Sequence, residues 1–116
     1  MALTQFARSG IFDPKMIADA FKTSSAELAH TVGLGRDAVQ RKNRIAAVAT
    51  QKRLRSMIEV INKVSPRFGS DLIAYAWYRS EPLAGFSGQT AMQLVKAGRV
   101  DDVLEYIDAV DAGVHA

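Results

Sequence analysis

Residue types that build crosslinked or metal-binding proteins are scarce in this chain of 116 residues, which has no cysteine, two histidines, one tryptophan and three prolines. The absence of cysteine excludes disulfides and thiolate metal ligands. The histidines, His30 and His115, have no partners at metal-ligand spacing. We therefore expect neither a bound metal nor a cofactor.

Long apolar runs are also missing from the sequence. None approaches the roughly 20 residues that a transmembrane helix needs. Residues 1–10 lack the basic head and apolar core of a signal peptide. We therefore expect a cytoplasmic protein that does not enter a membrane.

Catalytic patterns are absent as well. No nucleophile is spaced to meet a general base, so the sequence predicts a protein that is not an enzyme. The segment Gly85-Phe86-Ser87-Gly88 lacks the lysine and the preceding strand of a phosphate-binding loop. The acids between residues 101 and 108 fit a solvated helix face better than a cation site.

The charges that are present divide the chain unevenly. Residues 1–67 carry twelve Lys and Arg against five Asp and Glu, a net charge of +7. Residues 68–116 carry three against seven, a net charge of −4. The length suits one domain or two small subdomains that share a core. A basic half joined to an acidic half indicates two different partners, although an unevenly charged solvated surface is the plainer interpretation.

Apolar residues recur at helical spacing along most of the chain, and no segment shows the sustained alternation of a strand. We expect an all-α fold of about six or seven helices with short connections. Asp13-Pro14 and the capping box Ser24-Ser25-Ala26-Glu27 are typical helix starts, and Ser65-Pro66 is predicted to end the longest helix. The expected helices cover residues 14–21, 25–32, 36–44, 50–64, 71–78, 90–97 and 101–112.

Residues 25–44 have the spacing of a helix-turn-helix. Ala29 is small where the two helices would cross, and Val39 can anchor the second helix to the first. Gly33 stands where the turn favours a left-handed backbone. A helical hairpin that never touches DNA can meet the same pattern.

Basic residues follow the second of these helices. Seven Lys and Arg lie between residues 36 and 55, against the single acid Asp37. Such a cluster fits DNA, although a solvated basic helix face is the alternative. One recognition helix spans few base pairs, so we expect a homodimer. The predicted base contacts are Arg36, Gln40 and Arg41, and the predicted phosphate contacts are Lys42, Arg44 and Lys52.

The C-terminal part carries an ordered series of aromatic, glycine and aliphatic positions. The series is Trp77, Pro82, Leu83, Phe86, Gly88, Met92, Leu94, Val95, Gly98, Val103, Ile107 and Gly113. With it, the chain resembles the Xre/MbcA/ParS family of antitoxins, whose C-terminal part binds toxins of the RES-domain class. The resemblance spans residues 14–116 and is best from Arg53-Leu54 onward.

The resemblance implies a toxin that is ADP-ribosyltransferase-like and that consumes NAD or transfers from it. The antitoxin would cover the NAD site with its last helix and with a tail, residues 113–116, that turns away at Gly113. We add that Asp108, Asp111 and the terminal carboxylate can pair with cations that hold NAD phosphates. The expected toxin contacts are Trp77, Arg79, Phe86, Asp108, Asp111, Gly113, Val114, His115 and Ala116.

We therefore divide the chain into an arm (1–12), a helix-turn-helix with a connecting helix (13–66) and a toxin-binding domain (67–116). The arm either docks on the core through its aromatic residues or stays mobile. The leading function is the antitoxin of a type II toxin–antitoxin pair, which represses its own operon and forms a homodimer within a larger complex. The alternatives are a stand-alone helix-turn-helix regulator whose C-terminal half dimerises, and a structural adaptor without a DNA role.

Overall fold

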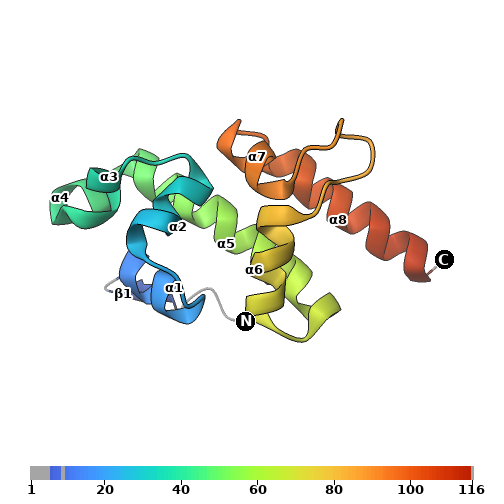
Figure 1. Cartoon of the computed structure of the whole chain (residues 1–116), viewed down its shortest axis with the longest axis horizontal. Helices are drawn as coiled ribbons and strands as arrows, with labels where there is room; N and C mark the ends of the chain where they lie inside the picture. The colour runs from blue at the N-terminus through green and yellow to red at the C-terminus, as the bar shows by residue number, and fades with distance from the viewer. Residues whose placement is uncertain (1–5, 9, 116) are drawn as a thin grey trace.

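The computed structural model describes residues 6–8 and 10–115. Figure 1 shows the first four helices gathered at one end of the molecule, while the C-terminal end of the last helix lies far from them. The all-α prediction is confirmed, because the strands of the described part contain two residues each. The elements are β1 (Ala7–Arg8), β2 (Ile11–Phe12), α1 (Pro14–Ala20), α2 (Ser25–Val32), α3 (Arg36–Gln40), α4 (Lys42–Ile45), α5 (Val48–Phe68), α6 (Asp71–Ser80), α7 (Ala91–Lys96) and α8 (Val100–His115).

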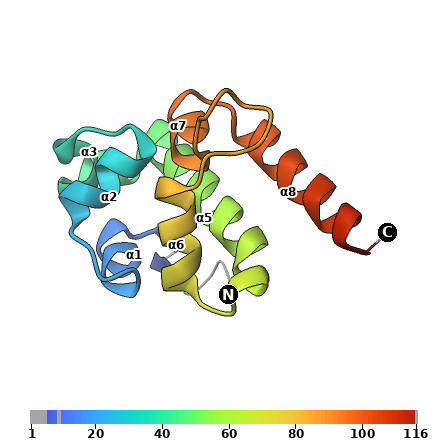
Figure 2. The same cartoon turned by 45° about the vertical axis from the view of Figure 1, so that its right-hand side comes forward.

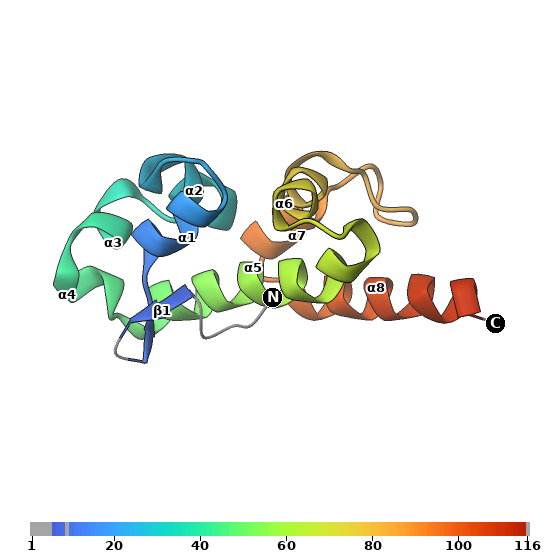
Figure 3. The same ribbon diagram turned by 90° about the horizontal axis from the view of Figure 1, so that it is seen from below.

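Helix α5, with 21 residues, is shared by both ends of the molecule. Figure 3 shows α1 and α2 over its first half, α6 over its second half and α8 extending beyond it. Its core side follows the helical spacing read from the sequence. The buried residues of this predicted stripe are Leu54, Met57, Ile58, Ile61 and Val64.

The ends of α5 differ from the prediction. It begins at Val48 and continues through Pro66 to Phe68, so the expected stop at Ser65-Pro66 is wrong. Gly69 ends the helix instead, with a left-handed φ of 67° and an amide that donates to the Ser65 carbonyl at 2.9 Å. A proline in the last turn removes only one backbone hydrogen bond, which the tertiary packing of a long helix can outweigh.

The expected helix over residues 36–44 is divided in two. Arg41 has an extended backbone, with φ of −91° and ψ of 126°, and it separates α3 from α4. This division raises the number of helices in the described chain to eight, one more than the expected range. A break of one residue leaves the helical spacing of the sequence almost unchanged, so the pattern could not reveal it.

The described part of the arm, residues 6–8 and 10–12, docks on the core, as the first of the two expectations for the arm has it. β1 and β2 pair as a short antiparallel hairpin, with Ala7 opposite Phe12. Phe6 and Phe12 are buried, whereas Ile11 is partly exposed. The side chain of Gln51 in α5 accepts the Phe12 amide at 2.8 Å and donates to the Phe12 carbonyl at 3.0 Å. The side-chain amide of Gln51 therefore pairs with Phe12 as the backbone of a neighbouring strand would.

The helix starts mostly follow the sequence signals. Asp13 accepts the Lys15 amide at 2.9 Å, and Ser24 accepts the Glu27 amide at 3.1 Å. A capping box with both of its bonds occurs at Thr90, which the sequence analysis did not single out. Within the described residues, no helix combines the length and the apolar character needed to cross a membrane.

Candidate functional site

The connection between α6 and α7, residues 81–90, is a loop closed at its base. Pro82 and Thr90 form an isolated antiparallel bridge there. Gly85 and Gly88 have φ of 85° and 81°, a region that favours glycine. Figure 2 shows the loop beside α7 and the start of α8. The closed base holds the loop in one shape against these helices.

An aromatic and cationic cluster joins this loop to α8. The ring of Phe86 meets the ring of Tyr106 edge-on, with centroids 5.9 Å apart. The guanidinium of Arg99 lies 5.6 Å from the centroid of Phe86 and is fixed by Asp102, with 2.8 Å between Nε and Oδ2. We call these four residues the Phe86 cluster. It presents a cation and partly buried rings at the edge of the molecule.

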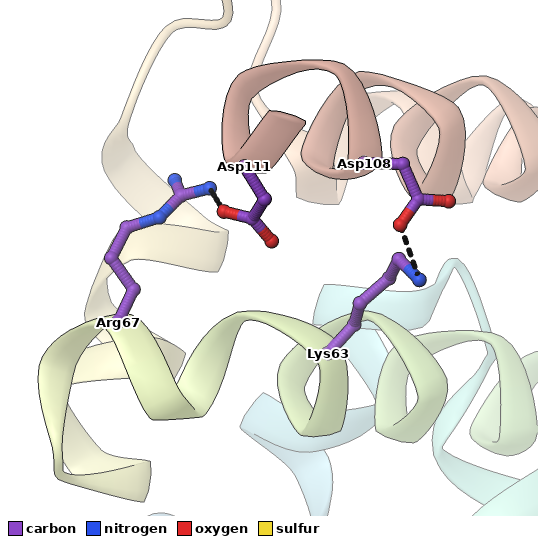
Figure 4. Close-up of polar contacts among 4 residues, drawn as sticks. All are labelled: Lys63, Arg67, Asp108 and Asp111. Atoms are coloured by element: carbon purple, nitrogen blue, oxygen red, sulfur yellow. Dashed lines mark hydrogen bonds and ion pairs between the residues drawn. The ribbon is translucent and has the colours of Figure 1, made fainter. Parts of the chain in front are cut away.

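Two ion pairs tie the second half of α8 to α5, as Figure 4 shows. The Nζ of Lys63 lies 2.7 Å from Oδ1 of Asp108, and Nη2 of Arg67 lies 2.8 Å from Oδ1 of Asp111. All four side chains are partly exposed, so each pair contributes at most about 1 kcal/mol to folding. The two carboxylates that the sequence assigned to a partner protein therefore already have cationic partners within this chain.

Helix α8 continues to His115, so the expected end at residue 112 and the expected turn at Gly113 are wrong. Gly113 is not among the residues with a positive φ. A glycine inside a helix costs about 1 kcal/mol relative to alanine, which the neighbouring helix-forming residues outweigh here. The side chains of Val114 and His115 and the whole of Ala116 lie outside the described part, as does their expected role.

Two further expected contact residues, Trp77 and Arg79, lie on α6. Trp77 is half-buried and packs against Phe68 at the end of α5, with ring centroids 6.4 Å apart. The guanidinium of Arg79 lies 4.5 Å from the ring centroid of Tyr75. Tyr75 in turn stacks on Phe21 next to α1, with centroids 4.8 Å apart. Trp77 and Arg79 therefore contact residues outside the Phe86 cluster.

The tyrosines of α6 are structural groups. The Tyr78 hydroxyl donates to the Thr31 carbonyl at 2.8 Å, and its burial raises the pKa of Tyr78 above the ordinary value, with a smaller contribution from Tyr75. Burial also raises the pKa of Tyr75, and the neighbouring hydroxyls of Thr31 and Thr23 offset this rise only in part. Neither phenol ionises near neutral pH, so neither can act as a base there.

Arg53 joins the two halves of the molecule. Its Nη1 donates to the carbonyls of Val32, Val95 and Lys96 at 3.4, 3.3 and 2.9 Å. These carbonyls lie at the C-terminal ends of α2 and α7, where unpaired backbone acceptors attract a cation. The sequence analysis placed Arg53 in the basic cluster, but its guanidinium is committed inside the protein.

Three positions that carry the helix-turn-helix prediction for residues 25–44 have the expected burial or backbone conformation, although the expected second helix is divided at Arg41. Ala29 and Val39 are buried, and Gly33 has a left-handed φ of 76°. A methyl group added at Gly33 would meet side-chain atoms of Arg53 and Lys96 at 3.5 Å. The turn at Gly33 therefore packs against the side chain of Arg53, which links α2 to α7.

The six residues predicted to contact DNA are all exposed. Arg41 lies 4.0 Å from Asp37, a distance and exposure at which pairing is weak. The other cations of the set make no side-chain ion pair within the part of the chain that the structure describes. The six are Arg36, Gln40 and Arg41 around α3, Lys42 and Arg44 in α4, and Lys52 in α5.

A shallow hollow of about 430 Å³ lies where the arm meets the first turns of α5. Its floor includes Phe12 and the 85% exposed Val48, and its rim includes Lys52 and Arg55. Arg55 is held over the Phe12 ring, 5.0 Å from its centroid. No group of three or more potential metal ligands is found among the described residues.

One comparison with known proteins gives a match, and it covers the C-terminal part of the chain. Residues 66–113 match the family described as the antitoxin Xre/MbcA/ParS C-terminal toxin-binding domain. We refer to these residues as the toxin-binding domain, after the family that they match. The resemblance read from the sequence is thereby confirmed for this segment. Comparisons with curated proteins and with solved structures give no match.

The toxin-binding domain runs from the last turn of α5 to the last turn of α8. Within it, the structure brings Phe86 onto α8, the helix that also carries Asp108 and Asp111. It leaves Trp77 and Arg79 on α6, where Trp77 packs against Phe68 of α5 and Arg79 lies over Tyr75 of α6 itself. The residues of this domain that were expected to contact a toxin therefore lie in at least two separate clusters.

The sequence analysis missed Arg99 and Tyr106 in the toxin-binding domain. Arg99 stands three residues before Asp102 at the start of α8, a spacing that predicts an ion pair. Tyr106 could be placed on a helix face but not against Phe86, because that contact depends on the loop conformation. The internal hydrogen bonds of Arg53 were not predicted, because its acceptors are 21 to 43 residues distant along the chain.

Proposed function

We propose that this chain is the antitoxin of a type II toxin–antitoxin pair, and that its partner is a RES-domain toxin. The observation that carries the proposal is the match of residues 66–113 to an antitoxin toxin-binding domain. This match favours the antitoxin over a stand-alone regulator, whose C-terminal half would only dimerise. The chain acts by binding rather than by catalysis.

In this proposal, the toxin-binding domain neutralises the toxin by covering its NAD site with the C-terminal end of α8. Residues 113–116 enter the cofactor cleft. The ion pairs of Asp108 and Asp111 support this role, because they hold α8 in place before binding and so lower the ordering cost. An ionised carboxylate has about four acceptor positions, so each acid can also accept from a toxin cation.

The same chain represses its own operon in this proposal, as a homodimer that is part of a larger toxin–antitoxin complex. Its DNA surface comprises the six predicted contact residues, all of them exposed, that lie between residues 36 and 52. The assignment is supported by the side-chain contacts, because none of these six residues makes a strong ion pair within the described residues. Arg53, Lys63 and Arg67, by contrast, are bound within the protein. Arg36, Gln40 and Arg41 face base edges and the others face phosphates.

The test begins with a search for a RES-like reading frame beside this gene, followed by co-expression of that toxin with this chain. The toxin alone should arrest growth and deplete NAD or modify a target, and co-expression of this chain should restore growth. The two proteins should also purify together as one complex. Growth arrest that persists at equal expression levels, without a complex, would rule out the antitoxin role and leave the DNA-binding regulator.

A further inference from the structure

Helix α6 is apolar on the side that faces solvent. A surface helix normally carries polar or charged residues on the side away from the core, and one that is apolar all round is usually buried. Here the outward side carries Leu72 at 40% exposure, Ile73 at 53% exposure, the exposed Ala76 and the half-buried Trp77, and it becomes polar only in its last turn, at the exposed Arg79 and Ser80. We call the four apolar residues the α6 stripe. Its composition indicates that it is covered in the working assembly.

The side of α6 opposite the stripe is buried, and its contacts hold the helix in place. Tyr78, on the opposite side of the helix, is buried and bonded to the Thr31 carbonyl at 2.8 Å. The first turn is capped by Ser70, whose hydroxyl accepts the Ile73 amide at 3.3 Å. Trp77 is fixed by its contact with Phe68. A surface that is ordered before binding loses little conformational entropy on association.

The rest of the toxin-binding domain offers less apolar surface. The exposed large hydrophobic residues of the described chain are Ile11, Val48, Leu72 and Ile73, and only the last two lie between residues 66 and 113. The acids Asp108 and Asp111 on α8 are already paired with cations of α5. An anchor for tight association therefore exists on α6 rather than on the acidic side of α8.

We propose that the α6 stripe is the anchor by which this chain holds its toxin, in an apolar groove of the toxin wide enough for one helix. This inference rests on the proposed function and names a docking surface for it. Partly exposed Leu, Ile and Trp side chains become the desolvated centre of the interface, where most binding energy resides. The C-terminal end of α8 then covers the NAD site from a position that α6 sets.

The location of the stripe argues for the toxin over a second copy of this chain. The stripe lies inside residues 66–113, the segment that matches a toxin-binding domain.

The test compares two variants of the full chain against the purified RES-domain toxin that the co-expression experiment identifies as its partner. The first is Leu72→Lys combined with Ile73→Lys, which charges the α6 stripe. The matched control is Val48→Lys, which charges an exposed apolar residue outside the toxin-binding domain. Titration calorimetry gives the affinity, thermal unfolding confirms the fold, and light scattering gives the mass of each chain without toxin.

The charged stripe should weaken toxin binding by at least about 100-fold, while Val48→Lys changes it by less than about threefold. The unfolding temperature and the mass without toxin should be unchanged in both variants. Equal affinities for the double variant and the wild type would overturn the anchor but leave the antitoxin role standing. A lower mass for the double variant alone would assign the stripe to a second copy, and failure of the wild type to bind would reject both proposals.

Discussion

Tyr78 of α6 donates its hydroxyl hydrogen to the carbonyl oxygen of Thr31 in α2, across 2.8 Å and 47 residues of chain. Both residues are buried. The bond therefore joins a helix of the toxin-binding domain to the first helix of the helix-turn-helix motif. Its removal leaves a buried acceptor without a donor, which costs more than an average hydrogen bond contributes.

Replacement Tyr78→Phe should lower the free energy of unfolding by about 1–2 kcal/mol, because the Thr31 carbonyl loses its side-chain donor without a change in packing volume. Urea unfolding followed by circular dichroism measures the change. Tyr106→Phe is the control, because the Tyr106 ring is only partly buried and its hydroxyl makes no hydrogen bond within the described residues. An equal loss in both variants would contradict the role of the Tyr78 bond.

Stability should also fall at alkaline pH. Burial raises the pKa of Tyr75 and of Tyr78, so the folded protein keeps these phenolic protons when the unfolded chain loses them. The contribution is fully present below about pH 10, the pKa of an unfolded tyrosine, and is lost progressively above it. Urea unfolding between pH 8 and pH 11 should show this decline, and Tyr78→Phe should make it shallower. A slope that is the same in both proteins would contradict the assignment.

Arg53→Met should destabilise both halves together, by about 1.5–3 kcal/mol, since carbonyls at the ends of α2 and α7 lose their charged donor. Unfolding should remain a single transition when tryptophan fluorescence and circular dichroism are compared. Arg55→Met is the matched control from the same helix. Arg55 is 57% exposed and its pairing with Glu59, at 3.8 Å, is weak, so we expect a change below about 1 kcal/mol.

The DNA surface predicts a defined salt dependence. Fluorescence anisotropy with the promoter region of its own operon should show affinity falling steeply with salt. Lys42→Ala combined with Arg44→Ala should reduce the slope of log affinity against log salt by about 1 for each phosphate contact removed. Lys15→Ala, an exposed cation of α1 outside the predicted surface, should leave the slope unchanged. Absence of binding by the wild type at low salt would remove the operator-binding proposal.

Deletion of residues 113–116 should weaken toxin inhibition by at least about tenfold, or about 1.4 kcal/mol, if the end of α8 enters the cofactor cleft. The fold should persist, because the last buried residue of α8 in the described structure is Ile107. Thermal unfolding of the truncated chain verifies this, and an NAD-consumption assay measures inhibition. Equal inhibition by the truncated and full chains would show that the terminal residues stay outside the cleft.

Periodic features of this fold could be predicted from the sequence. The stripe of α5 from Leu54 to Val64 repeats at helical spacing and is buried as expected. Gly33 was assigned a left-handed turn because of its place between two helical patterns, and it has one. In the C-terminal part, the ordered series of residues identified a toxin-binding domain that the family match places at residues 66–113.

Features that depend on tertiary contacts could not be predicted. Pro66 was taken as a helix stop, but α5 continues to Phe68 because packing of the helix outweighs one lost backbone bond. Gly113 was taken as a turn, but it lies within α8. Asp108 and Asp111 were assigned to a partner because their cations in α5 stand more than 40 residues earlier in the chain.

Helix α5 has a practical consequence for protein engineering. Tyr78 of the toxin-binding domain bonds to α2, and Arg53 binds both α2 and α7, so the two modules share one interior. A fragment cut at residue 66 would expose apolar side chains that α5 now covers. A graft that carries residues 66–113 onto another protein should therefore begin near Val48, so that it includes the long helix, and a swap of this segment in evolution would have had to carry that helix along.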